Sequence, residues 1–130
     1  MKSWLVEKTR REGLFYKNSI FLKSAIQKLM HFKFGINKKI ENYLAQNKIV
    51  KIHFGCGTSM LNGFLNTDIF GAIPIDVTKN LPFPDKSIDV IFSNHLVEHI
   101  QNRQFIFFMK ESFRVLKDSG IQIIGTPSLD

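Results

Sequence analysis

Cysteine is almost absent from this sequence, and long apolar runs are missing altogether. Cys56 is the single cysteine, so an internal disulfide is excluded. No apolar stretch approaches the roughly 20 residues that a membrane-spanning helix needs, and lysines and arginines interrupt every candidate signal peptide before Met30. One cysteine and four histidines also offer few metal ligands, and no metal is expected. These absences predict a protein of the reducing cytoplasm.

Acidic residues are scarce in the N-terminal part of the chain. Residues 1–51 hold 12 Lys and Arg against 3 Asp and Glu, whereas residues 52–130 hold 6 against 8, so the net charge of +7 belongs to the first segment. The composition is 44% hydrophobic with 13 Phe, which is typical of a globular protein. A chain of 130 residues can bury one modest core, so we expect a single domain.

The basic segment has helical periodicity. Lys17 and Lys28 fall opposite an apolar stripe, and Gly35 is expected to end this helix. Asn37 is expected to cap a second helix that runs to Asn47. Such a basic helix either covers the core with a solvated lysine face or attaches to an anionic surface, a membrane leaflet or nucleic acid. The stripe consists of Phe15, Leu22, Ala25, Ile26 and Leu29.

From residue 49 the pattern changes to strands and turns. Strands are predicted at residues 49–54, 64–68, 73–77, 89–93 and 121–126, and one long helix at 97–117, stopped by Asp118-Ser119-Gly120. The strands are apolar almost throughout, which indicates a parallel sheet buried on both faces and therefore an α/β fold. The side chains expected to face inward from the helix are Phe105, Phe108, Met109, Phe113 and Leu116.

The first strand breaks into Gly55-Cys56-Gly57, and Asp68 follows eleven residues after Gly57. Glycines at such a break let backbone approach a ligand without a Cβ in the way, and an acid at the end of the next strand can accept both ribose hydroxyl protons. This pairing predicts a nucleotide-type cofactor site. Nothing nearby in sequence would lower the thiol pKa of Cys56, which favours a small packing residue over a nucleophile.

An ordered series of motifs resembles the class I S-adenosylmethionine-dependent methyltransferases, in particular the type 11-like group. The resemblance covers Lys51 to Pro127. It implies a Rossmann-like, mostly parallel sheet of about five strands flanked by helices. Residues 1–48 would form a basic helical extension, and 49–130 a cofactor-binding part that is incomplete at its C-terminus. The series reads HFGCG, GFLNTDIF, DVTKNLPFPDKSIDVIFSNHLVEHI, FRVLKDSG and TP.

The resemblance implies S-adenosylmethionine as cofactor and a role for each matching residue. The Gly55 turn would pass beneath the methionine and ribose, Asp68 would bind the ribose hydroxyls, and Asp76 with Val77 would contact the adenine. Asp68 and Asp76 could instead be simple turn acids. His95 would either act as a general base or line the pocket. The expected cofactor-binding residues are His53, Gly55, Cys56, Gly57, Asp68, Asp76, Val77, Asn94 and His95.

Two other enzyme classes share parts of this pattern. His95, Glu98 and His99 match the H-x-x-E-H order of inverted zinc peptidases, but the motif directly follows a buried strand. A dinucleotide dehydrogenase would need a third glycine where this chain has Met60. His53 stands where the resembled family commonly has an acid. The methyltransferase interpretation therefore remains the prediction, with Glu98 and His99 in mostly structural roles.

The last predicted strand would be an open sheet edge, because the chain stops at Asp130. An apolar edge at residues 121–124 invites pairing with another chain, which predicts a possible homodimer. The alternative function is an inactive or fragmentary methyltransferase-like domain that acts as a binding or dimerising module. The expected acceptor of an active enzyme is a small molecule, such as a sugar or a lipid-linked glycan, with possible membrane-surface contact through the basic helix and no nucleic acid.

Overall fold

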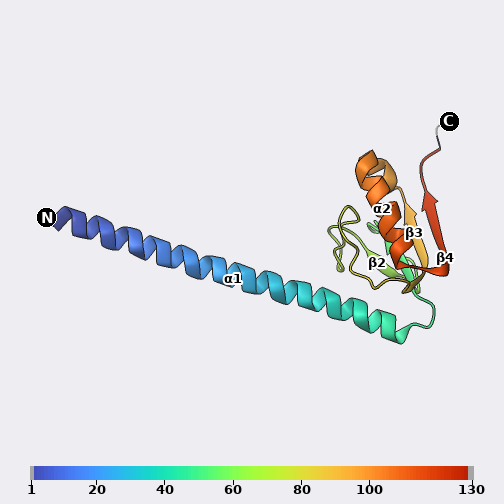
Figure 1. Cartoon of the computed structure of the whole chain (residues 1–130), viewed down its shortest axis with the longest axis horizontal. Coiled ribbons are helices and arrows are strands. Elements are labelled where there is room, and N and C mark those ends of the chain that lie inside the picture. Colours follow the sequence, from blue (N-terminus) through green and yellow to red (C-terminus); the bar gives the residue numbers. More distant parts are fainter. Residues whose placement is uncertain (1, 129–130) are drawn as a thin grey trace. The chain divides into compact units, whose positions relative to one another are not determined.

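The structure, a computed structural model, describes residues 2–128, with side chains from residue 22 onward. The chain divides into two compact units, Met1–Gly35 and Ile36–Asp130. Figure 1 shows the helices and strands along the chain. They are α1 Lys2–Gln46, β1 Lys51–Phe54, β2 Leu65–Thr67, β3 Ile88–Asn94, the 3-10 helix η1 Val97–His99, α2 Asn102–Val115 and β4 Leu116–Gly125.

The sheet is parallel throughout, with strand order β2-β1-β3-β4. Ile52 at the centre pairs with Leu65 on one side and Ile91 on the other. The α/β, Rossmann-like prediction is confirmed, but four strands form within residues 2–128 where about five were expected. The predicted strand at 73–77 is reduced to one bridge between Asp68 and Pro74, because proline has no N–H with which to continue a ladder.

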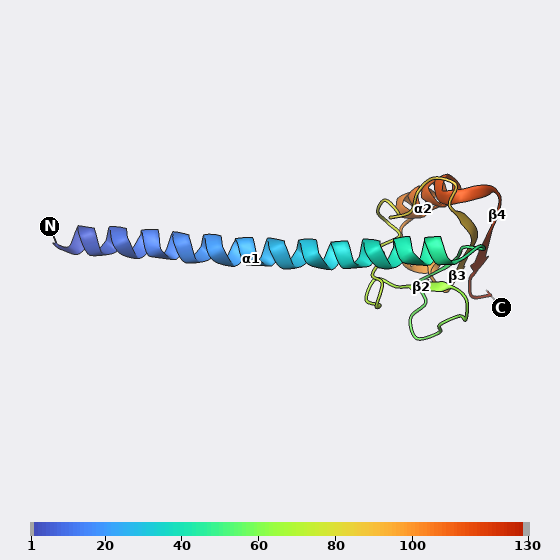
Figure 2. The ribbon, with the colours of Figure 1, turned by 90° about the horizontal axis from the view of Figure 1, so that it is seen from below.

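One face of this sheet packs against α2 (Figure 2). The ring of Phe54 lies 5.7 Å from that of Phe108 and 6.2 Å from that of Phe83, both in edge-to-face geometry, which aromatic quadrupoles favour. Ile52 and Ile91 complete this centre with no exposed surface. The hydrophobic core therefore lies mainly on the face of the sheet that α2 covers.

The other face is only partly buried. His53 contacts the ring edge of Phe92, and Phe92 in turn contacts Phe64. On β4, however, Ile121 and Ile123 are 58% and 49% exposed. The expectation of burial on both faces is wrong for β4, because about half of each of these side chains remains exposed.

Helix α1 continues through Gly35, so the predicted end at Gly35 and the second cap at Asn37 are wrong. Glycine permits a helix stop but does not impose one, and no proline follows to prevent the chain from continuing. The last turns of α1 belong to the unit that contains the sheet: Ile40 is 2% exposed in the core. The hydroxyl of Tyr43 lies 2.8 Å from the carbonyl oxygen of Lys51 and fixes the approach to β1.

Within the first unit, the described part of α1 exposes many large apolar side chains. They are 49–69% exposed, and none is paired with another element of that unit. The described residues include no helix that is long and apolar enough to cross a membrane. These side chains are Leu22, Ile26, Leu29, Met30, Phe32 and Phe34.

The long helix predicted at 97–117 is interrupted. The backbone is extended at Ile100 and Gln101, and Gln101 forms a reciprocal capping box with Gln104 that starts α2 at Asn102. The helix then ends at Val115, and Asp118-Ser119-Gly120 lies within β4.

Phe113 was expected to face inward but is 76% exposed, which corrects that prediction. The buried residues Phe108, Ser112 and Val115 follow the i, i+4, i+7 spacing of one helical face. Phe113 follows Phe108 by five residues, a spacing that places it on a different face of the helix from the buried residues. The ammonium group of Lys86 lies 4.9 Å from the centre of its ring.

An arginine of α2 joins the proline-rich loop to this helix. The Arg114 guanidinium contacts the carboxylates of Glu111 and Asp85, each at 2.7 Å, and donates to the carbonyl oxygens of Leu81 and Phe83 at 3.0 Å. Glu111 accepts the amide N–H of Leu81 at 2.8 Å. This network raises the pKa of Arg114 and lowers that of Glu111, chiefly through their mutual hydrogen bond. The loop that leaves Val77 is thereby held in place.

Candidate functional site

The carboxyl ends of the strands meet at one edge of the sheet, and the glycine turn begins there. Gly55 and Gly57 have φ values of 66° and 50°, which side chains other than glycine rarely adopt. A Cβ on Gly55 would lie 2.9 Å from Cδ1 of Leu96, which is closer than carbon atoms can approach. The backbone conformation thus favours glycine at position 55, and an added Cβ would also displace the side chain of Leu96.

Asp68 is hydrogen-bonded to this turn. Its Oδ2 accepts the N–H of Gly57 at 3.0 Å, and its Oδ1 accepts the N–H of Phe70 at 3.2 Å. A carboxylate has about four acceptor positions, so each oxygen keeps a lone pair for a further donor. Asp68 is therefore both a turn acid and an acceptor at the edge of the sheet.

Cys56 is buried between the two glycines. Its N–H donates to the carbonyl oxygen of Thr67 at 3.0 Å, which joins the turn to β2. Burial raises the pKa of the thiol, and the negative charge of Asp68 raises it further. The thiol is therefore neutral, and its environment suits a packing residue better than a nucleophile.

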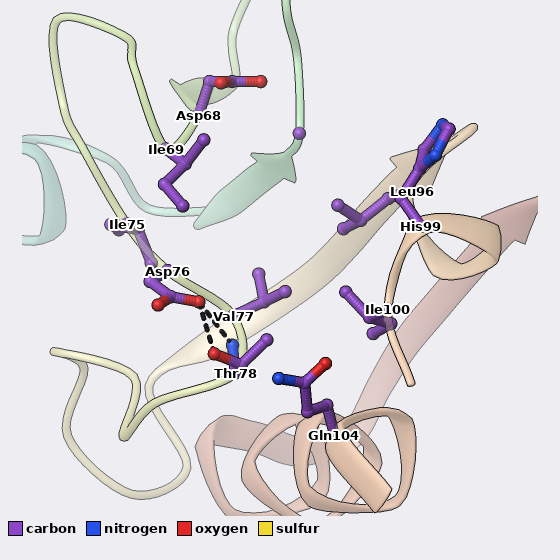
Figure 3. A pocket seen from close by; sticks show the side chains of 11 residues that line it. Asp68, Ile69, Ile75, Asp76, Val77, Thr78, Leu96, His99, Ile100 and Gln104 are labelled. Atoms are coloured by element: carbon purple, nitrogen blue, oxygen red, sulfur yellow. Dashed lines mark hydrogen bonds between the residues drawn. The ribbon is translucent and has the colours of Figure 1, made fainter. Parts of the chain in front are cut away.

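A cavity of about 380 Å³ opens between the ends of β1, β2 and β3; we call it the Asp76 cavity. In Figure 3 Asp68, Ile69 and Asp76 line one side, and Leu96 and Ile100 face them from the other. Its lining is mostly apolar, with two carboxylates at the margin. The lining residues are Gly55, Asp68, Ile69, Ile75, Asp76, Val77, Thr78, Leu96, His99, Ile100 and Gln104.

Asp76 is held by its own turn. Its Oδ1 accepts both the N–H of Thr78 at 2.9 Å and the hydroxyl of Thr78 at 2.7 Å. The hydroxyl bond is the main reason that the pKa of Asp76 is lowered, so the carboxylate is ionised near neutral pH. Among the described residues Oδ2 has no hydrogen-bond partner, which leaves an acceptor for a ligand in the cavity.

A second cavity of about 420 Å³ lies on the other side of the glycine turn; we call it the His95 cavity. Gly55 lines both cavities. The nine predicted site residues are therefore divided between two spaces: Asp68, Asp76 and Val77 line the first, and the others line the second. The second lining consists of His53, Gly55, Cys56, Gly57, Thr58, Ser59, Leu61, Phe92, Asn94 and His95.

The two histidines of the His95 cavity differ in their surroundings. His53 is 3% exposed, and its Nδ1 lies 3.1 Å from Oδ1 of Asn66. The side chain of His95 is 59% exposed, and its Nδ1 lies 3.2 Å from Oε1 of Glu98. His95 also has a positive φ of 53°, which is uncommon for a residue with a side chain and is often found at functional sites.

Several lining residues were not anticipated from the sequence. Ile69 directly follows Asp68 and Thr78 directly follows Val77, so the neighbours of the predicted acids were the available signal. His99 and Ile100 line the Asp76 cavity although the sequence suggested a structural role for His99. They reach it because η1 ends at His99 and the chain turns before α2, a break that the periodicity did not reveal.

The H-x-x-E-H segment does not bring its histidines to one cavity. His95 lines one cavity and His99 the other, and Glu98 contacts His95. Within residues 2–128 no group of three or more His, Cys, Asp or Glu is placed to hold a metal ion. This geometry gives the zinc-peptidase alternative no support.

The structure is an open parallel α/β domain with two cavities at the carboxyl edge of its strands, the edge where such folds commonly bind ligands. Residues 66–124 match the family model described as "Methyltransferase domain". A 48-residue segment is 38% identical to a probable S-adenosylmethionine-dependent methyltransferase of Mycolicibacterium smegmatis and, equally, to ones of Mycobacterium tuberculosis. Over these segments the chain is similar to S-adenosylmethionine-dependent methyltransferases.

These matches cover limited parts of each protein. The 48-residue segment is 37% of this chain and 18% or 17% of the mycobacterial relatives, so it spans less than a fifth of their length. A solved structure described as an S-adenosyl-L-methionine-dependent methyltransferase of Methanococcus maripaludis is also similar. It has a TM-score of 0.49 and 21% identity, over 70% of this chain and 53% of that one.

Proposed function

We propose that this chain binds S-adenosylmethionine and transfers its methyl group to a small-molecule acceptor. The observation that carries the proposal is the hydrogen bond from Gly57 to Asp68, which places a fixed carboxylate beside a glycine turn at the edge of the sheet. A carboxylate beside a glycine turn suits the binding of a ribose and of the methionine group attached to that ribose.

The residues of the Asp76 cavity fit the adenosine part of the cofactor. Its volume of about 380 Å³ is in the range of small-molecule sites. Asp68 would accept the ribose hydroxyls through its free lone pairs, and the unpartnered Oδ2 of Asp76 would accept the exocyclic amine of adenine. Ile69, Val77 and Ile100 supply apolar surface for the two faces of the base.

The methionine part would pass along the glycine turn toward the His95 cavity. Gly55 borders both cavities, so its missing side chain leaves room for the sulfonium at their boundary. When bound, the cofactor supplies an electrophilic methyl group. The protein's own part is to align an acceptor with that methyl group and to exclude water, since displacement at a sulfonium depends mainly on positioning. His95 is our candidate for the group that takes the acceptor's proton.

The acceptor would occupy the His95 cavity. Its lining offers imidazole, amide and hydroxyl groups from His53, Asn94, Thr58 and Ser59, a set that suits a hydroxylated molecule. A sugar or a lipid-linked glycan is therefore our proposed acceptor class, and we expect no nucleic acid.

Membrane-surface contact through α1 is a further part of this proposal. Leu22, Ile26 and Leu29 share one face at i, i+4, i+7 spacing and are all exposed, whereas Lys23 and Lys28 lie to either side of it. A helix with an apolar face between lysines suits an anionic bilayer surface. The exposed leucines favour a bilayer over nucleic acid, which has no apolar interior. A cytoplasmic location at the membrane agrees with this reading.

The alternative function is a binding or dimerising module, and β4 favours it. This strand pairs with β3 alone, so its other edge is free within the described chain, and Ile121 and Ile123 are exposed beside it. A second copy could pair along that edge. A dimer is also compatible with the enzyme proposal, so oligomeric state alone does not decide between them.

Calorimetric titration with S-adenosylhomocysteine tests the enzyme proposal without requiring the acceptor. We expect saturable binding that weakens at least tenfold in Asp68→Ala, because the ribose loses its acceptor. Asp118→Ala is the matched control. Asp118 is an exposed acid of β4 that forms an ion pair with Lys86, and it lines neither cavity. Circular dichroism would show that all three proteins are folded. If the wild-type chain is folded but does not bind S-adenosylhomocysteine, the enzyme proposal is overturned. The binding or dimerising module then remains as the proposed function.

A further inference from the structure

Glu98 is the one carboxylate that contacts a histidine in the described part of the chain. Its Oε1 lies 3.2 Å from Nδ1 of His95. Glu98 itself lines neither cavity, whereas His95 lines the second. His95 therefore lines the cavity, and Glu98 contacts His95 without lining the cavity itself.

This contact determines which nitrogen of His95 carries the proton. A carboxylate accepts hydrogen bonds, so Nδ1 must be the donor, and the neutral ring then has its lone pair on Nε2. Nε2 has no hydrogen-bond partner among residues 2–128. In this tautomer of the neutral ring, Nε2 is the nitrogen that can accept a proton.

The backbone of His95 is held at the end of β3. The N–H of His95 donates to the carbonyl oxygen of Gly125 at 3.1 Å, which joins the end of β3 to the end of β4. The positive φ of 53° turns the chain sharply after Asn94 and is unfavourable in a residue with a Cβ. Such a conformation is kept where the surrounding contacts demand it.

We propose that Glu98 is a positioning residue that holds His95 as the proton acceptor for a hydroxyl group of the methyl acceptor. This inference rests on the proposed methyl transfer. A sugar hydroxyl is a weak nucleophile that must lose its proton as it reacts, so it is the acceptor class that gains most from an oriented imidazole. Glu98 would act in the way that an orienting carboxylate acts on a catalytic histidine elsewhere.

The step balances without any further reactant. The acceptor oxygen forms a bond to the methyl carbon, the carbon–sulfur bond breaks, and its electron pair stays on the sulfur. The hydroxyl proton passes to Nε2 of His95, and the resulting imidazolium is stabilised by the carboxylate of Glu98. The products are a methyl ether and S-adenosylhomocysteine.

Nitrogen-15 NMR of histidine-labelled full chain tests the pair, because the two neutral tautomers have distinct ring-nitrogen shifts. At alkaline pH we expect His95 with its proton on Nδ1 in the wild type and a majority of the Nε2-protonated form in Glu98→Ala. Glu98→Gln keeps an acceptor oxygen and should restore the wild-type tautomer. Glu41→Ala, which removes an exposed glutamate of α1, should change nothing, and His31 serves as an internal reference.

The outcomes separate this inference from the function on which it rests. A wild-type His95 protonated on Nε2, or a tautomer unchanged in Glu98→Ala, would overturn the role of Glu98. Calorimetry with S-adenosylhomocysteine on the same samples reports the cofactor site independently, and we expect equal affinity in wild type and Glu98→Ala. The wild-type spectrum alone can overturn the proposal even if the alanine variant fails to fold, because an Nε2-protonated ring cannot donate from Nδ1 to Glu98. In that case Glu98→Gln supplies the comparison.

Discussion

Leu96 packs over Gly55 so closely that its Cδ1 would lie 2.9 Å from a Cβ at that position. The loop after β3 and the turn after β1 are thus in direct contact at the boundary of the two cavities. Any side chain at residue 55 would displace Leu96, which lines the Asp76 cavity. Because residue 55 itself lines both cavities, the added side chain would also change the shape of the His95 cavity.

Gly55→Ala should therefore abolish S-adenosylhomocysteine binding. The added methyl group overlaps Leu96, and the φ of 66° costs about 1–2 kcal/mol in a residue with a Cβ. Gly35→Ala is the matched control, since nothing lies within 4 Å of a Cβ there and the residue is helical. That control should retain binding and stabilise α1 by up to about 1 kcal/mol. Calorimetry and thermal unfolding measure both effects, and unimpaired binding by Gly55→Ala would contradict this packing argument.

The Glu111–Arg114 pair should make the fold sensitive to acid. The folded pKa of Glu111 lies below its ordinary value of 4.5, mainly because Arg114 donates to the carboxylate. Its contribution to stability is therefore complete above the unfolded pKa and is lost as the pH falls through the folded pKa. Urea unfolding at pH 7, 5, 4 and 3 should show this decline.

Glu111→Gln should be less stable than wild type at pH 7 by about 1–2 kcal/mol, the scale of a hydrogen bond to a charged group. Its free energy of unfolding should also fall less steeply between pH 5 and 3. Arg103→Gln, an exposed change in the same helix, should behave as wild type. A parallel pH dependence in Glu111→Gln and wild type would assign the acid sensitivity to other carboxylates, such as Asp89 beside Lys117.

Ser93→Ala should not destabilise the protein and should raise its melting temperature. The hydroxyl of Ser93 is fully buried on β3 and has no hydrogen-bond partner among the described residues. An unsatisfied buried hydroxyl costs about 1–3 kcal/mol, and alanine removes it with little change in volume. Thr67 is the comparison, since its buried hydroxyl donates to the carbonyl oxygen of His53 at 3.1 Å and Thr67→Val should destabilise. A loss of stability in Ser93→Ala would show that the hydroxyl has a partner after all.

The α1 surface predicts binding to anionic vesicles. The full chain should sediment with vesicles containing phosphatidylserine but not with pure phosphatidylcholine, and salt should weaken the binding. Replacing Leu22 and Leu29 by serine should weaken it at least tenfold, since burial of one leucine contributes about 1.5 kcal/mol or more. Gln27→Ser, on the polar side of the same helix, should have no effect. Equal binding to both vesicle types would contradict a lysine-dependent contact.

The strands and their order of appearance could be predicted because apolar runs and glycine breaks are local signals. The sequence placed the glycine turn and Asp68 at the same edge of the sheet, since parallel strands bring their carboxyl ends together. The hydrogen bond between Gly57 and Asp68 was not predicted and is a finding of the structure. Asp76 could be placed beside its turn for a similar reason: Thr78 stands two residues later and bonds its carboxylate.

The errors have a different origin, because they depend on tertiary contacts. The break at Ile100 and Gln101 lies within a helical apolar pattern, and only the capping pair Gln101 and Gln104 shows where α2 begins. Phe113 was assigned to the core by its hydrophobicity, although the ring lies on the exposed face of α2 beside Lys86. The division of the predicted site into two cavities depends on the path of the glycine turn, which spacing alone does not specify.

The two backbone amides that hold Asp68 bear on the entropy of ligand binding. The carboxylate is already restricted by Gly57 and Phe70 when the chain is folded. Immobilising a free side chain on binding typically costs about 0.5–1.5 kcal/mol, and here most of that loss has occurred during folding. If the proposed function is correct, a bound ribose would meet a carboxylate that is already in place, so selectivity at this point would be that of a rigid receptor.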